Sequence, residues 1–122
     1  MQLYLFSQNF FLKPHDGQSL IEEIINSVTH GIGALLGISA LVILTVLSAE
    51  QESTLKVVGS VIFGSSLIIM YSASACYHAV QLDKWKHLFK IIDHSSIYLL
   101  IAGTYTPVVL VLLSPGWGWS LF

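Results

Sequence analysis

The sequence predicts an all-α protein, a polytopic transmembrane helix bundle with three spans and the start of a fourth. Of its 122 residues, 54% are hydrophobic and only 10% are charged, and the mean hydropathy is +0.74. A soluble domain normally carries about 25% charged residues. The apolar residues also gather into three long segments, each close to the roughly 20 residues that a helix needs to cross a bilayer. These observations together predict a membrane protein.

The segments follow one another in a simple order. Residues 1–20 are predicted to be a cytoplasmic N-terminal tail, and residues 21–122 to be a partial transmembrane domain. The first helix is expected to begin a turn or two before its apolar core, and helix-breaking residues follow the third span. The last three residues read as the start of a fourth span, so a truncated sequence is expected. The predicted spans are 32–49, 57–80 and 91–113, with polar loops at 50–56 and 81–90.

The lysines predict the orientation. Lys84, Lys86 and Lys90 fall in the 81–90 loop and Lys13 lies on the same side, whereas Lys56 alone lies on the other. Cytoplasmic loops carry an excess of Lys and Arg, so the N-terminus and this loop are predicted to be cytoplasmic. The chain has no Arg and no basic patch, which argues against a nucleic-acid partner. Its single cysteine excludes an internal disulfide.

Polar residues lie at the start of the first and third spans and at the end of the second span. On each predicted helix they share a stripe, at steps of three and four residues, with small residues that allow close helix approach. Alternating spans bring these groups to the cytoplasmic side, where ionisable groups at the edge of the hydrocarbon suggest a functional site. We therefore expect the stripes to face a common bundle interior. The predicted polar cluster comprises Glu23, Asn26, Thr29, His30, Ser74, His78, Asp93 and His94.

Several chemistries fit this cluster. His78 is a candidate metal ligand that Asp93 could orient, but a catalytic zinc site uses three protein ligands, and the chain offers no convincing third. His30 could instead hydrogen-bond within the first span, with Asn26 and Thr29. Ser74 and His78 share a helical face, which leaves open a nucleophilic pair. A proton relay and a purely structural hydrogen-bond network also remain open.

The motifs resemble those of the hemolysin III family of bacterial membrane proteins. This family is related to the adiponectin and progestin receptors and, more distantly, to the alkaline ceramidases. The resemblance covers nearly the whole chain from about residue 20 and is specific in combination. It rests on Glu23-Ile-Ile-Asn26-Ser-Val-Thr29-His30-Gly31, Ser74-Ala-Cys-Tyr77-His78, and Asp93-His94-Ser-Ser-Ile97-Tyr98 continuing to Ala102-Gly103-Thr-Tyr105-Thr106-Pro107.

The resemblance implies a seven-helix fold in the bacterial inner membrane with a zinc site near the cytoplasmic side. His78 would be a zinc ligand, Asp93 would hold the water at the metal, and Ser74 completes the Ser-x-x-x-His element. The family's later His-x-x-x-His is absent from this chain, so the zinc site is expected to be incomplete here. The implied activity is zinc-dependent hydrolysis of a lipid amide. Cytolytic pore formation and a non-enzymatic sensing or structural role are the alternatives, with membrane lipids as partners in each case.

Overall fold

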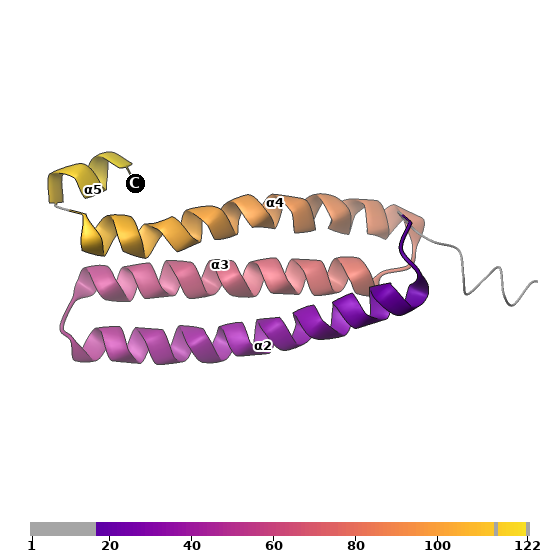
Figure 1. Ribbon diagram of the computed structural model, residues 1–122, viewed down its shortest axis with the longest axis horizontal. Coiled ribbons are helices and arrows are strands. Elements are labelled where there is room, and N and C mark those ends of the chain that lie inside the picture. Colours follow the sequence, from indigo (N-terminus) through magenta and orange to yellow (C-terminus); the bar gives the residue numbers. More distant parts are fainter. Residues whose placement is uncertain (1–16, 114, 122) are drawn as a thin grey trace, which may run out of the picture.

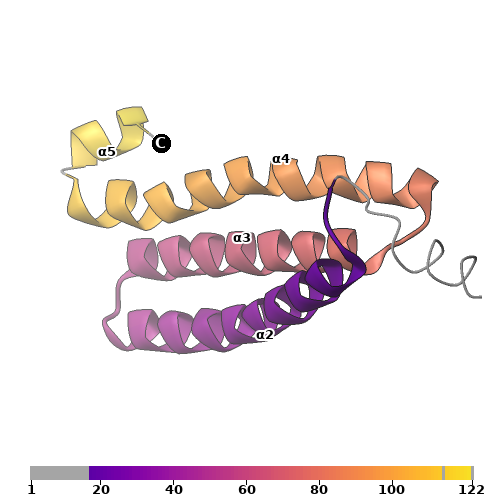
Figure 2. The same cartoon turned by 45° about the vertical axis from the view of Figure 1, so that its right-hand side comes forward.

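The computed structural model describes residues 17–113 and 115–121, and they form a row of antiparallel helices. The elements are α2 (Leu20–Glu50), α3 (Thr54–Ala79), α4 (Asp83–Pro107), the π-helix η1 (Val108–Leu112) and α5 (Pro115–Leu121). Figure 1 shows α3 lying between α2 and α4, and Figure 2 shows α2 inclined to the other two. The predicted all-α class is confirmed, and three helices are long and apolar enough to cross a membrane.

Helix α2 begins much earlier than its apolar core suggests. Its 31 residues correspond to about 46 Å of helix, well beyond the roughly 30 Å of a bilayer's hydrocarbon core. A capping box starts it: the Glu22 amide donates to the Ser19 hydroxyl at 3.3 Å, and the Ser19 amide donates to the Glu22 carboxylate at 2.7 Å. The extra turns make the whole segment from Glu23 to His30 helical. Most of the predicted tail, residues 1–16, lies outside the described residues.

The predicted polar loop at 81–90 is wrong in extent. Helix α4 already begins at Asp83, so only a short connection follows α3. Lys86 is 4% exposed and helical, although its charge suggests a loop residue facing the cytoplasm. Its amino group finds partners inside the bundle, which removes the main reason for it to stay in water.

The stripes of small residues mark the helix contacts, but they do not enclose a single interior. A methyl group on Gly64 of α3 would come within 3.0 Å of the Leu41 backbone on α2. On the opposite side of α3, a methyl group on Gly103 of α4 would collide with Ser66. Because α3 is the middle helix of the row (Figure 1), it needs two contact faces. The predicted stripe that carries Ser74 and His78 is only the face toward α2.

The C-terminal end of α4 changes its helical register after Pro107. Proline has no amide hydrogen to donate, so the helix cannot continue with its normal bonding pattern. The next five residues form the π-helix, and the Thr106 hydroxyl donates to the Ala102 carbonyl at 2.9 Å. Bonds from Thr hydroxyls to the backbone and short π-helical turns are typical where a membrane helix accommodates a proline. The predicted break after the third span is confirmed, but Pro115 starts the short helix α5, which folds back toward η1.

Candidate functional site

A buried ionic cluster ties the three long helices together at the end where α2 begins. Glu23 of α2 is 2% exposed, and its Oε2 accepts hydrogen bonds from Lys86 Nζ of α4 at 2.7 Å and from His78 Nδ1 of α3 at 2.9 Å. Lys86 also donates to the Tyr77 carbonyl at 2.9 Å, and its Nζ lies 4.4 Å from the centre of the Tyr77 ring. Buried charges persist only when they are paired in this way.

A second polar contact joins α2 to α3 further into the bundle. His30 Nδ1 lies 2.6 Å from the Ser74 hydroxyl. The His30 ring also meets the His78 ring edge-on, with 5.7 Å between their centres, so the two contacts form one continuous polar region. The hydrogen bonds of the described residues thus pair Ser74 with His30 and His78 with Glu23. They do not form the Ser74–His78 pair that a helical nucleophile would need.

The remaining predicted residues lie around this region with less central roles. Thr29 is exposed, and its hydroxyl donates to the Ile25 and Asn26 carbonyls of its own helix, at 2.8 and 3.1 Å. Asn26 is half-buried. The side chain of His94 is 61% exposed, and its Nδ1 donates to the Lys90 carbonyl at 2.9 Å. These residues therefore border the cluster or face away from it.

Asp93 is largely buried but sits deeper in the bundle than the ionic cluster. Its side chain is 14% exposed, and its Oδ2 lies 3.4 Å from His94 Nδ1. It follows Lys86 by seven residues on the same face of α4, which is about 10 Å along the helix axis. Since Lys86 is level with Tyr77, and Gly103 with Ser66, Asp93 falls close to the depth of Ser74. It thus belongs to the same end of the bundle as the other predicted residues.

The side chains of the cluster do not make up a complete metal site among the described residues. Within residues 17–113 and 115–121, no group of three or more His, Cys, Asp or Glu side chains is placed to hold a metal ion. The Nδ1 atom of His78 is engaged by Glu23, and Nε2 is its other ring nitrogen. Glu23 Oε1 is also buried, with no hydrogen-bond partner among the described residues. His78 is therefore suited to be one ligand of a site completed by other groups.

Lys86 is the residue of this cluster that sequence reasoning missed. Its neighbours Lys84 and Lys90 favour a place in a charged loop, and no pattern in the chain names a partner for Glu23. One signal points the other way: Lys86 precedes Asp93 by seven residues, the spacing of two turns on one helical face. If the third predicted helix begins two turns earlier, Lys86 lies on the same stripe as Asp93.

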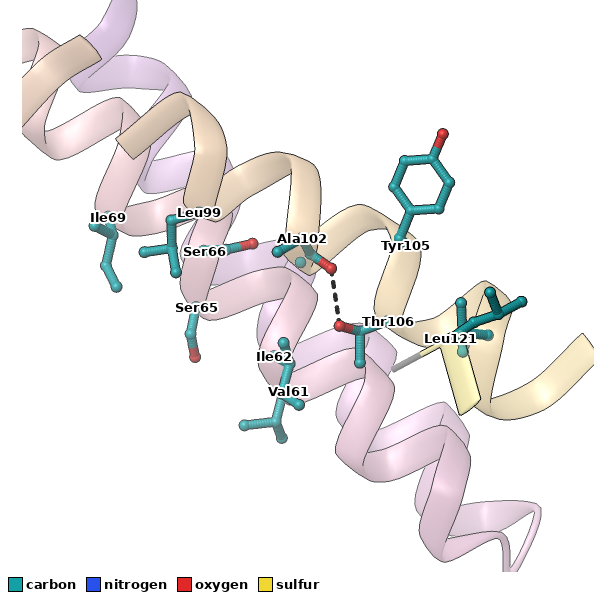
Figure 3. A pocket seen from close by; sticks show the side chains of 12 residues that line it. Val61, Ile62, Ser65, Ser66, Ile69, Leu99, Ala102, Tyr105, Thr106 and Leu121 are labelled. Carbon is teal, nitrogen blue, oxygen red and sulfur yellow. Dashed lines mark hydrogen bonds between the residues drawn. The ribbon is translucent and has the colours of Figure 1, made fainter. Parts of the chain in front are cut away.

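A cavity lies in the other half of the bundle and offers no comparable chemistry. It has a volume of about 550 Å³ and opens between α3, α4 and the end of α5 (Figure 3). The hydroxyl groups of Ser66 and Thr106 donate to the Phe63 and Ala102 carbonyls, at 2.8 and 2.9 Å. The cavity therefore suits an apolar occupant. Its lining residues are Val61, Ile62, Ser65, Ser66, Ile69, Leu99, Ala102, Gly103, Tyr105, Thr106, Val109 and Leu121.

Comparison with known proteins agrees with this architecture. The family described as "Haemolysin-III related" matches residues 18–122. The chain is 45% identical to Hemolysin-3 of Bacillus cereus over 104 residues, which cover 85% of this chain and 48% of that protein. It is 47% identical to the Hemolysin-3 homolog of Bacillus subtilis (strain 168) over 100 residues, which cover 82% of this chain and 47% of that protein.

The matches cover most of this chain but only part of each relative. The chain spans about half the length of the curated relatives it matches. No solved structure shows a significant match to it. The match to the family runs from just before α2 to the last residue, and it includes the three long apolar helices and the buried cluster between them. The chain therefore belongs to the haemolysin-III related family of membrane proteins.

Proposed function

We propose that this chain contributes His78 to a zinc site inside a multi-pass membrane protein. The supporting observation is the buried pair of His78 and Glu23, joined at 2.9 Å. A metal-binding histidine almost always donates its second ring N–H to a carboxylate, carbonyl or water, which orients the ring. The same end of the bundle holds His30, Ser74 and Asp93, so the polar groups that such a site needs are gathered there.

The other ligands would come from beyond this chain. A catalytic zinc ion uses three protein ligands and keeps one position open. The described residues do not supply that number, and the matched relatives are about twice as long as the aligned stretch. The resemblance to hemolysin III proteins points to a His-x-x-x-His on a later helix as the source of the missing ligands.

The reaction that this arrangement would support is hydrolysis of a lipid amide. A bound zinc ion would lower the pKa of water to about 7 and polarise a carbonyl group. Asp93 offers a largely buried carboxylate as a proton acceptor close to the depth of Ser74, and the Ser74 hydroxyl is held by His30 at 2.6 Å. A site bordered by apolar helices favours a lipid substrate, since the apolar part of such a molecule partitions into the membrane.

The orientation is proposed from the distribution of the remaining lysines. Lys86 is buried in the cluster and cannot count as a loop charge. Lys84 is exposed at the start of α4 and Lys90 is half-buried one turn after Lys86, whereas Lys56 lies at the opposite end of the bundle. We place the buried cluster at the cytoplasmic side of the bacterial inner membrane, with the N-terminus cytoplasmic.

Zinc content tests the ligand assignment. The protein, purified from membranes at the length that cells produce, should carry about one zinc ion per chain. His78→Ala should weaken zinc affinity at least about tenfold and so lower zinc occupancy, because a ligand is lost outright. Zinc is measured by elemental analysis of the purified protein. His87→Ala, a change at an exposed histidine of α4, is the control. Full zinc occupancy in the His78→Ala protein would reject the assignment.

A second candidate function follows from the names of the relatives, which call them hemolysins. If the protein forms pores, the purified protein should release an entrapped dye from liposomes, whether or not zinc is removed by a chelator. Asp93→Asn should not change that release, because a pore does not need a proton acceptor. Liposomes that stay sealed at protein concentrations sufficient for insertion would exclude the pore.

A further inference from the structure

We propose that Glu23 and Lys86 are positioning residues for His78, which hold its imidazole in the one tautomer whose free nitrogen can bind a metal. The inference deepens the proposed function and rests on it where the metal is concerned. The contacts on which it depends are those of Glu23 Oε2 with His78 Nδ1 and with Lys86 Nζ, at 2.9 and 2.7 Å.

The first step concerns which nitrogen carries the proton. An ionised carboxylate can only accept hydrogen bonds. Lys86 is a hydrogen-bond donor with no acceptor capacity, and its charge lies 2.7 Å from Glu23 Oε2, so the partner oxygen is that of a carboxylate. His78 Nδ1 must therefore be the donor in its contact with Glu23. In a neutral imidazole the proton then resides on Nδ1, and Nε2 keeps its lone pair.

The second step concerns the burial of the cluster. The side chains of Glu23, His78 and Lys86 are all at least nine-tenths buried. A buried polar group that loses its hydrogen-bond partner is costly, and water has little access to replace the partner. The hydrogen bond from His78 Nδ1 to Glu23 Oε2 is therefore the contact that fixes which ring nitrogen carries the proton.

The third step concerns rigidity. Glu23, His78 and Lys86 come from α2, α3 and α4, so the carboxylate is anchored from both of the other long helices. The Tyr77 carbonyl and ring give Lys86 two further contacts, at 2.9 Å to the oxygen and 4.4 Å to the ring centre. A ligand whose orientation is set by such outer contacts keeps its lone pair aimed in one direction.

The test is nitrogen NMR of the His78 ring in the protein at the length that cells produce, reconstituted in lipid bilayers without added metal. The native protein should show His78 protonated at Nδ1 and unprotonated at Nε2. The double variant Glu23→Leu/Lys86→Met removes the acceptor and leaves neither charge of the pair behind, which favours folding. In it, the signal of the unprotonated Nε2 should fall to a minority, because nothing then holds the proton on Nδ1.

A control variant and a conservative variant accompany this test. Glu22→Gln/Lys84→Met changes an exposed acid and an exposed lysine on the same two helices, and it should leave the His78 signals unchanged. Glu23→Asp with Lys86 retained keeps a carboxylate and should restore most of the Nδ1–H form. A native protein with the proton on Nε2, or a double variant that keeps it on Nδ1, would overturn the positioning role. Zinc ions that leave the native Nε2 signal unmoved at every concentration would reject the proposed metal site instead.

Discussion

Replacing Lys86 with Met should destabilise the helix bundle by about 3–5 kcal/mol, the cost of breaking a buried ion pair by removing one partner. Met preserves most of the side-chain volume, so the loss comes chiefly from the charge. The Glu23 carboxylate would remain 2% exposed, with the hydrogen bond from His78 but without the cation that balances its charge. The measurement is the free energy of unfolding in mixed micelles, followed by the loss of helical circular dichroism as denaturing detergent is added.

The partner substitution provides the control. Glu23→Leu/Lys86→Met removes both charges, and replacing a buried pair by apolar residues of similar size is often neutral or stabilising. The double variant should therefore regain most of the lost stability, less about 1 kcal/mol for the hydrogen bond that His78 loses. If Lys86→Met alone is as stable as the native protein, the cluster is not a buried ion pair in the membrane.

Replacing Gly103 with Ala should destabilise the contact between α3 and α4 by about 1–3 kcal/mol, the usual cost of overpacking. The added methyl group would collide with Ser66, whose hydroxyl is already bonded to the Phe63 carbonyl at 2.8 Å. The Ser66 Cβ, 2.7 Å from the position of the added methyl group, is fixed to the backbone and cannot rotate away, so the helices must separate. The same unfolding measurement checks this expectation.

Another glycine of the chain makes the comparison specific. Gly31 has no atom within 4 Å of the place where a methyl group would stand, so Gly31→Ala should raise stability by up to about 1 kcal/mol through helix propensity alone. Exchanging the small residue across the contact, in Gly103→Ala/Ser66→Gly, should recover most of the loss. Equal effects of Ala at positions 31 and 103 would contradict the close packing of α3 on α4.

Much of the architecture could be read from the sequence because it depends on local composition. Long apolar segments must become helices in a bilayer, since unpaired backbone groups are too costly there. Helical periodicity also places Glu23, His30 and Gly37 on one stripe of the first helix, and these three residues do face α3. The same periodicity places Ser74 and His78 on one face of the second helix. These predictions need no knowledge of the tertiary structure.

The sequence did not predict where the third helix begins or which side chains bond across the helices. Charge suggests that Lys86 belongs to a loop, but a buried carboxylate from another helix holds it inside. The i, i+4 spacing of Ser74 and His78 suggests a pair, yet each bonds a different residue of α2. Spacing along one helix reports which side chains share a face, and it says nothing of what the neighbouring helix brings to that face.

The sequence by itself determined that this protein is a helical membrane protein whose polar residues collect at one end of the bundle. Hydrophobic segment length and helical periodicity are properties of the chain alone, so they needed no further information. Only the tertiary structure decided that α3 is the middle helix and that Glu23 joins His78 to Lys86. That arrangement depends on two contacts whose residues are separated by 55 and 63 positions in the sequence. Such contacts form only when three helices pack together and exclude water from the charges between them.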